Sequence, residues 1–202
     1  MEFGCGHSLP LISLSSIRPS RNSDEYTGLD YNIDTVTSKT WVNKVINVGP
    51  SDDRFKFYAG DWNGFAPGSD VYDVLLFSET CYTPLATRDT AGLIRKCLKT
   101  NGVAVVAGKN FYFGVGGGVN LLKDELGRVG VKVLEKEGWK WNNGEVSWGA
   151  LGNGTECAFT TFSSVTPTLF SIVSLRSSPR THSLLSSQSN VREIIVCTLE
   201  GT

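Results

Sequence analysis

Hydrophobic and polar positions along the chain follow two periods, one typical of strands and one typical of helices. Short apolar or alternating runs predict strands at Glu25–Leu29, Arg54–Tyr58, Val71–Phe77, Val103–Ala107 and Arg192–Leu199. Helices are expected over Leu9–Ile17, Asp34–Val45, Leu85–Leu98 and Val119–Leu134. Because strands and helices alternate, the sequence predicts an α/β fold with a doubly wound parallel sheet.

Two of these elements carry further expectations. Val71–Phe77 is an almost continuous apolar run, as in a central parallel strand that is covered on both faces. Asn101-Gly102 is expected to end the helix over Leu85–Leu98, since glycine commonly follows a helix C-terminus.

The stretch from Trp139 to Asn190 departs from this rhythm. Half of the residues from Thr160 to Ser189 are Ser or Thr, and no Asp or Glu occurs between Cys157 and Arg192. Such a composition gains little apolar burial to offset the entropy of ordering. We therefore expect a disordered or atypical insertion over residues 139–190, with a binding tail as the alternative.

Length and charge narrow the class of protein. The 202 residues fit one domain over residues 1–202, and the net charge of −1 gives no electrostatic footprint for nucleic acid or an anionic membrane. No apolar run approaches about 20 residues, so no membrane span is expected. The five cysteines lack C-x-x-C spacing and only two histidines are present. We therefore expect a reducing compartment and no metal site. We also expect a monomer that is cytoplasmic and nuclear.

A glycine-rich turn opens the chain at Glu2-Phe3-Gly4-Cys5-Gly6-His7-Ser8. Glycines one residue apart before an apolar helix are typical of a loop whose backbone approaches a nucleotide, and a plain tight turn is the alternative. Ribose binding requires an acidic residue about 20 positions further on, at the end of the second strand, and Asp30 stands there. The alternative role for a polar side chain here is to cap the next helix, which Asn32 or Asp34 could equally do.

Two further polar stretches follow strands at the same edge of the predicted sheet. Gly60-Asp61-Trp62 offers a carboxylate for an adenine amine and an indole to lie against the base, with a surface turn as the alternative. Ser78-Glu79-Thr80-Cys81-Tyr82 ends the central strand, where a carboxylate and a phenol could flank a substrate. The alternative there is a helix N-terminus capped by Ser78 or Thr80.

The most unusual stretch is Lys109-Asn110-Phe111-Tyr112-Phe113-Gly114-Val115-Gly116-Gly117-Gly118. Three aromatic residues run into a glycine-rich loop after a strand, which indicates a rim that grips an extended peptide or a flat side chain. Core packing is the alternative for at least one of Phe111 and Phe113.

Taken together and in this order, these motifs resemble the protein-histidine N-methyltransferase family related to methyltransferase-like protein 18. The motifs are Glu-x-Gly-Cys-Gly, Asp-Tyr-Asn, Gly-Asp-Trp, Ser-Glu-Thr-x-Tyr and Tyr-Phe-Gly-Val-Gly-Gly-Gly. The resemblance covers about residues 1–135 and 191–199, and the aromatic glycine motif is its most specific part. It implies a Rossmann-like, seven-stranded class I methyltransferase sheet with helices on both faces and an antiparallel last strand.

The resemblance also implies a cofactor, a substrate and the residues that contact them. The cofactor is S-adenosylmethionine, and the methyl group goes to a histidine ring nitrogen of a large-subunit ribosomal protein. The implied cofactor-binding residues are Glu2, Gly4, Cys5, Gly6, His7, Asp30, Tyr31, Asp61, Trp62 and Ser78. Glu79 and Tyr82 are the implied catalytic residues, and the substrate would meet Tyr112, Phe113, Gly116 and Gly117.

The chain departs from the family pattern in two places. Its first strand is expected to be largely missing, as if the N-terminus were truncated, and residues 139–190 have no family counterpart. A lysine-directed methyltransferase of the same fold is the alternative enzyme, and an inactive cofactor-binding scaffold is the alternative from another class. A dinucleotide-dependent oxidoreductase fits less well, because the aromatic glycine loop has no role in hydride transfer.

Overall fold

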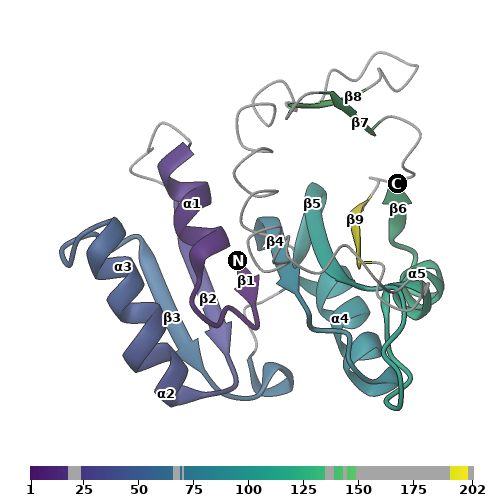
Figure 1. Ribbon diagram of the computed structural model, residues 1–202, viewed down its shortest axis with the longest axis horizontal. Coiled ribbons are helices and arrows are strands. Elements are labelled where there is room, and N and C mark those ends of the chain that lie inside the picture. The colour runs from purple at the N-terminus through teal and green to yellow at the C-terminus, as the bar shows by residue number, and fades with distance from the viewer. Residues whose placement is uncertain are drawn as a thin grey trace, which may run out of the picture.

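The computed structural model describes residues 1–17, 24–65, 69, 71–134, 139–142, 145–148 and 192–199. In this part of the chain, seven strands form one sheet in the order β3-β2-β1-β4-β5-β9-β6 (Figure 1). The strands are β1 Glu2–Phe3, β2 Tyr26–Asp30, β3 Phe55–Ala59, β4 Tyr72–Ser78, β5 Leu98–Lys109, β6 Lys132–Leu134 and β9 Arg192–Thr198. Neighbours from β3 to β5 are parallel, whereas β9 is antiparallel to both β5 and β6. The expected seven-stranded sheet with an antiparallel last strand is therefore confirmed, and β1, with two residues, lies between β2 and β4, the central strand.

The helical elements connect these strands. They are α1 Leu9–Ile17, α2 Ile33–Thr35, the π-helical turn η1 Val36–Thr40, α3 Trp41–Asn47, the 3-10 turn η2 Trp62–Gly64, α4 Pro84–Cys97 and α5 Val119–Arg128. The three elements from Ile33 to Asn47 follow one another without a break, where a single helix was predicted. Thr83 accepts a hydrogen bond from the Ala86 N–H and caps α4, so the alternative that Ser78 or Thr80 caps this helix is wrong.

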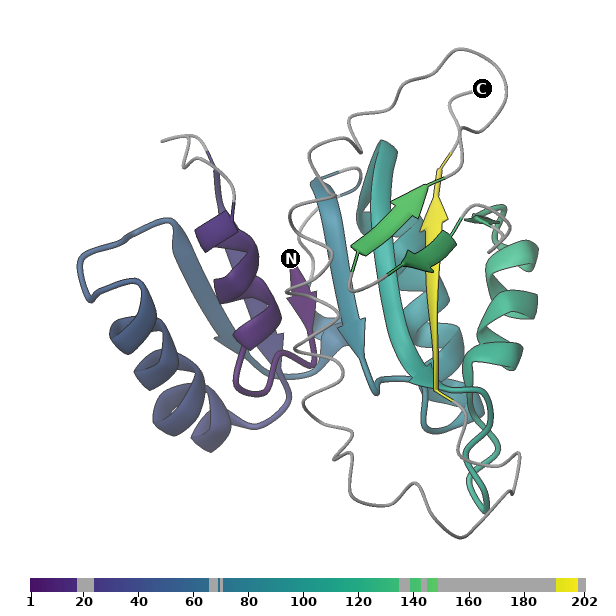
Figure 2. The ribbon, with the colours of Figure 1, turned by 45° about the horizontal axis from the view of Figure 1, so that its top comes forward.

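Helices cover both faces of the sheet, as predicted. Figures 1 and 2 show α1 in front of the sheet and α4 behind it. Along β4, Leu75 and Phe77 belong to the core that α4 and α5 cover, whereas Leu76 belongs to the core under α1. The apolar run of this strand follows from its place, since alternate residues must be apolar on both sides.

Two predicted boundaries between elements are wrong. Asn101-Gly102 does not separate a helix from a strand, because β5 begins directly at Leu98 and passes through both residues. Asn101 has a φ of 64° and the register with β4 shifts between Tyr72 and Val74, so the turn residues form an irregularity within the strand. The predicted helix over Val119–Leu134 ends at Arg128, and Gly130, with a φ of 71°, leads into β6.

Part of the predicted insertion has regular structure. β7 Trp139–Asn142 and β8 Glu145–Trp148 pair in an antiparallel hairpin. The rest of the predicted insertion, up to Asn190, lies outside the described residues.

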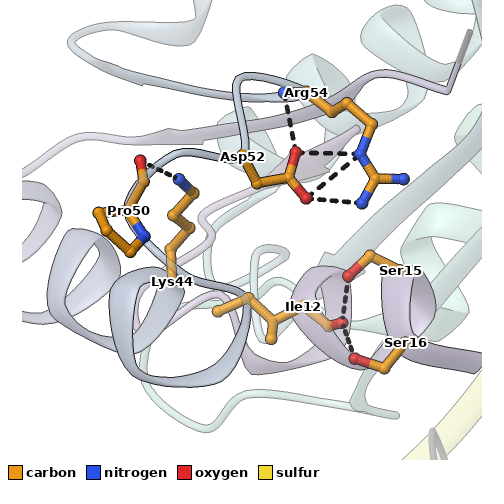
Figure 3. A network of polar contacts seen from close by, with 7 residues as sticks. All are labelled: Ile12, Ser15, Ser16, Lys44, Pro50, Asp52 and Arg54. Carbon is orange, nitrogen blue, oxygen red and sulfur yellow. Dashed lines mark hydrogen bonds and ion pairs between the residues drawn. The ribbon is translucent and has the colours of Figure 1, made fainter. Parts of the chain in front are cut away.

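Polar contacts fix α3 to the segment that leads into β3 (Figure 3). Lys44 is only 1% exposed, and its Nζ donates a 3.0 Å hydrogen bond to the Pro50 carbonyl just beyond the helix end. Asp52 and Arg54 form a bidentate ion pair on the same segment, with a shortest separation of 2.6 Å. Both contacts give the crossover from β2 to β3 a fixed geometry.

No helix in the described part of the chain is long and apolar enough to cross a membrane.

Candidate active site

The glycine turn follows β1 and has an unusual backbone. Gly4, Gly6 and Ser8 all have positive φ, at 64°, 50° and 54°. Glycine adopts this region without strain, but serine does not, so Ser8 needs local support. The Ser8 N–H donates to the Cys5 carbonyl at 2.6 Å, and its buried hydroxyl donates to Oε2 of Glu2 at 3.0 Å. The buried Glu2 carboxylate therefore holds the end of the turn.

Asp30 joins this turn to the end of β2. Its Oδ2 accepts a 2.8 Å hydrogen bond from the Gly6 N–H, and its Oδ1 accepts a 3.0 Å bond from the Asn32 N–H. The side chain of Asn32 caps α2 by accepting from the N–H groups of Asp34 and Thr35. Asn32 is therefore the residue that caps this helix. Asp30 is half-buried and lies beside the glycine turn, which is the position that the prediction of ribose binding requires.

Gly4 lies against two other segments of the predicted site. A Cβ at Gly4 would come within 3.3 Å of the Trp62 ring and 3.2 Å of Cγ2 of Thr80. Trp62 also packs edge-on against Phe3, with ring centroids 5.9 Å apart. The Asp61 carboxylate accepts a 3.1 Å hydrogen bond from the Asn63 N–H. This contact is the kind that the alternative of a surface turn predicts. The close approach at Gly4 brings the glycine turn next to the residue that follows Glu79.

Glu79 directly follows β4 and has a strained backbone conformation. Its φ is 55°, and its N–H donates to the Ala107 carbonyl of β5 at 2.8 Å. The Tyr112 hydroxyl donates a 2.7 Å hydrogen bond to Oε2 of Glu79 and accepts a 3.3 Å bond from the Lys109 N–H. Burial of Tyr112, together with the bond to Glu79, raises the pKa of its phenol well above the ordinary value, so it remains a donor at neutral and mildly alkaline pH.

The glycine loop is pinned to Tyr82. The Gly117 N–H donates to the Tyr82 carbonyl at 3.1 Å, and the Tyr112 N–H donates to the Gly117 carbonyl at 3.0 Å. The rings of Tyr82 and Tyr112 meet edge to face at 5.3 Å. A Cβ at Gly117 would overlap the backbone of Cys81 and Tyr82, so this position requires glycine for want of space. Gly116 has a φ of 78° and lies over Pro84.

The two phenylalanines of this loop are exposed. Phe111 and Phe113 are 48% and 72% exposed, and they form an edge-to-face pair with centroids 5.3 Å apart. Core packing for either one, which the sequence left open, is therefore wrong. The buried aromatic residue is Tyr112, which is 7% exposed.

The remaining predicted site residues differ in their exposure to solvent. His7 and Tyr31 are exposed, Ser78 is half-buried at the end of β4, and the thiol of Cys5 lies beneath the turn against Gly28. Burial raises the pKa of the Cys5 thiol to about 12, so this side chain is an uncharged packing group.

Sequence reasoning missed two residues that contact the glycine turn. The Thr40 hydroxyl donates to the Gly6 carbonyl, and the Asn43 amide donates to the His7 carbonyl. Neither forms part of a motif, and their placement depends on a π-helical turn that periodicity did not predict.

Comparison with solved structures defines the class of the fold. A chain from the complex between the Haloferax volcanii Trm112 methyltransferase activator and a methyltransferase matches with a TM-score of 0.56 at 15% identity, over 100% of this chain and 81% of that one. A Listeria monocytogenes protein named as an S-adenosylmethionine dependent methyltransferase matches with a TM-score of 0.57 at 11% identity, over 99% and 90% of the two chains. This protein therefore has a class I S-adenosylmethionine-dependent methyltransferase fold.

Comparison with curated sequences finds more specific similarities. A histidine protein methyltransferase 1 homolog from Dictyostelium discoideum is 32% identical over 139 residues, which cover 66% of this chain and 43% of that protein. Its counterpart from Rattus norvegicus is 27% identical over 166 residues, or 67% and 45% of the two chains. No family model matches the chain. The predicted resemblance is confirmed as a similarity in sequence: the chain is similar to proteins named histidine protein methyltransferase 1 homolog, and it spans less than half of their length.

The residues of the glycine turn fit the cofactor of this fold. Gly6 has open space where a side chain would stand, so the backbone there is accessible to a ligand. Asp30 uses one lone pair of each carboxylate oxygen on an N–H group, and ionised carboxylates have about four such sites. Acceptor capacity for ribose hydroxyls therefore remains beside an accessible backbone.

Proposed function

We propose that this chain binds S-adenosylmethionine and transfers its methyl group to a histidine ring nitrogen of a protein. The observation that carries the proposal is the contact of Gly4 with Thr80, which joins the turn held by Asp30 to the Glu79–Tyr112 pair. A nucleotide site and a carboxylate for the acceptor thus lie side by side at the carboxyl edge of the sheet. The histidine target is taken from the relatives' name.

In this proposal the glycine turn and its neighbours hold the cofactor. Asp30 accepts from the ribose hydroxyls, while the backbone around Gly4 and Gly6 faces the methionine part. Asp61 and Trp62 lie towards the adenine, and Ser78 lies beside the cofactor. When bound, S-adenosylmethionine supplies an electrophilic methyl group on a positively charged sulfur.

Glu79 has the central role in the proposed transfer. A histidine is mostly neutral at pH 7, and its unprotonated ring nitrogen attacks the methyl carbon. The new N–C bond forms as the C–S bond breaks, and the electron pair stays on the sulfur of S-adenosylhomocysteine. Glu79 accepts the N–H of the other ring nitrogen, which fixes the tautomer and stabilises the positive charge that develops on the ring.

Tyr112 and Tyr82 support this arrangement from the substrate side. The Tyr112 hydroxyl occupies one oxygen of Glu79 and so fixes the direction of its carboxylate. The half-exposed ring of Tyr82 and the exposed ring of Phe113 are placed to contact the target protein, with Gly116 and Gly117 shaping the loop between them. We propose a large-subunit ribosomal protein as the target, as the resemblance implies. We also propose that the enzyme is a monomer of the cytoplasm and nucleus.

The pH dependence of transfer tests the nature of the acceptor. With a histidine target, the rate should fall as the pH drops through about 6.5 and should be nearly flat from about 7.5 to 9. The raised pKa of Tyr112 keeps its hydroxyl protonated over that upper range. A lysine acceptor must first lose a proton, so a rate that still climbs across the upper range would contradict the proposal.

A further inference from the structure

The helical segment between β2 and β3 reaches back to the glycine turn through two side chains. Thr40 is fully buried, and its Oγ1 donates a 2.5 Å hydrogen bond to the Gly6 carbonyl. One helical turn later, Nδ2 of Asn43 donates a 3.0 Å bond to the His7 carbonyl. Two consecutive carbonyls of the turn are thus bound by two residues of one helix face, three positions apart.

A wide helical turn precedes these contacts. η1 ends at Thr40, whose hydroxyl also lies 3.3 Å from the Thr35 carbonyl, and the Trp41 N–H bonds to the Val36 carbonyl five residues back. Such a turn contains one more residue than an α-helical turn and changes which side chains face the sheet edge. Single π-helical turns occur often at functional sites.

The glycine turn is therefore fixed from opposite sides. β2 binds its N–H groups, since Cys5 donates to the Leu29 carbonyl at 3.1 Å and Gly6 donates to Asp30. The helical segment binds its carbonyls. In a planar trans peptide the C=O and the following N–H point in opposite directions. The bond from Thr40 to the Gly6 carbonyl consequently points the His7 N–H away from η1.

The segment that carries Thr40 and Asn43 has its own support. The buried Lys44 ties the end of α3 to Pro50, so the helix cannot shift easily relative to the sheet. The chain thus contains a fixed helical segment that donates hydrogen bonds to the Gly6 and His7 carbonyls of the turn.

We propose that Thr40 and Asn43 are positioning residues that set the glycine turn in its cofactor-binding conformation. The inference rests on the proposed function, because the cofactor is the ligand that the turn would bind. Neither residue needs to touch the cofactor, since both act through the carbonyls of Gly6 and His7.

Calorimetric titration of the full chain with S-adenosylmethionine tests the role of Thr40. Thr40→Val keeps the shape and removes the hydroxyl, so the Kd should rise about three- to tenfold. Thr40→Ser restores the hydroxyl and should bring the Kd back to within about twofold of wild type. Thr37→Val is the matched control, because among the described residues the Thr37 hydroxyl bonds only to Ile33 and Asp34 of its own helical segment. It should leave the Kd unchanged.

Asn43 provides an independent test at a more accessible position. Asn43→Ala should weaken binding about threefold or more, whereas Asn47→Ala should not, because the Asn47 amide donates only to the Asn43 carbonyl. This pair decides the question if Thr40→Val does not fold.

The outcomes separate this inference from the proposed function. If the wild-type chain does not bind S-adenosylmethionine, the proposed function is contradicted. If wild type binds but Thr40→Val and Asn43→Ala bind equally well, only the positioning role is overturned. A lowered Tm with unchanged Kd, or a Thr40→Ser variant as weak as Thr40→Val, would show a purely structural role.

Discussion

The hydroxyl of Tyr112 donates a 2.7 Å hydrogen bond to Oε2 of Glu79, which lies 33 positions earlier in the chain. The bond connects the end of β4 to the loop after β5, and it reaches a carboxylate whose backbone is already strained by a φ of 55°. A carboxylate held in this way has a defined direction before any substrate arrives. This pre-orientation is what a charge-stabilising residue needs in the proposed transfer.

Removal of the Tyr112 hydroxyl should therefore slow transfer without weakening cofactor binding. Tyr112→Phe retains the buried ring but removes a charge-assisted hydrogen bond, so we expect a loss in kcat of about tenfold to a hundredfold. The Kd for S-adenosylmethionine, measured by calorimetry, should stay within about twofold of wild type. An equal loss in affinity and rate would place Tyr112 in the cofactor site instead.

Gly117 should be intolerant of any side chain for steric reasons. A Cβ there overlaps the backbone of Cys81 and Tyr82, so Gly117→Ala must displace the loop from Tyr82. The rate of methyl transfer should therefore fall by about tenfold or more. Gly114→Ala is the matched control. Gly114 has a φ of 76° but open space around it. Gly114→Ala should therefore lower the free energy of unfolding by about 1–2 kcal/mol and leave the contact between Gly117 and Tyr82 intact. Similar transfer rates in the two variants would argue against the contact.

Asp30 should be essential for cofactor affinity. Asp30→Ala removes an acceptor of ribose hydroxyls and also frees the Gly6 N–H, so S-adenosylmethionine should bind about tenfold to a hundredfold more weakly. Asp34→Ala removes a nearby exposed carboxylate of α2 and should have little effect. Unchanged affinity in the Asp30 variant, measured by calorimetry, would exclude Asp30 from the site.

Four buried thiols in the described part of the chain should make the fold sensitive to alkali. Burial raises the pKa of Cys5 and Cys197 from 9.0 to about 12, and it also raises the pKa of Cys81 and Cys97. Between pH 9 and about 12 the unfolded chain loses the protons of Cys5 and Cys197, whereas the folded chain keeps them. The stability that the protonated thiols contribute is therefore fully present below pH 9. Above pH 9 it should fall by at most about 1.4 kcal/mol per pH unit for each thiol.

Thermal denaturation at pH 8, 9 and 10 measures this slope. Cys197→Ala removes one of the four thiols and should flatten the decline of Tm above pH 9 relative to wild type. A wild-type Tm that is constant from pH 8 to 10 would contradict the burial of these groups.

The positions of most strands and the residues at the sheet edge were largely predictable from the sequence. Apolar runs such as Val71–Phe77 mark buried strands, and a polar motif directly after a parallel strand must lie at its carboxyl edge. Asp30, Glu79 and Tyr112 consequently appear where their motifs place them. Whether each of the predicted residues contacts a ligand stays a prediction.

Features that depend on tertiary contacts could not be predicted. The three aromatic residues from Phe111 to Phe113 look equivalent in sequence, and only the partner Glu79 makes Tyr112 the buried one. The sequence does not show which glycine of the loop is constrained and why: Gly116 and Gly118 have positive φ, whereas Gly117 is constrained by space. Thr40 carries no motif at all, because its role depends on the wide turn η1.

Mass spectrometry of a ribosomal-protein extract, incubated with the full chain and labelled S-adenosylmethionine, tests the central claim most directly. Wild type should add one labelled methyl group to a histidine ring. Glu79→Gln should reduce that labelling about a hundredfold or more while still binding the cofactor. Labelling on lysine alone, or equal histidine labelling by the Glu79→Gln variant, would contradict the account.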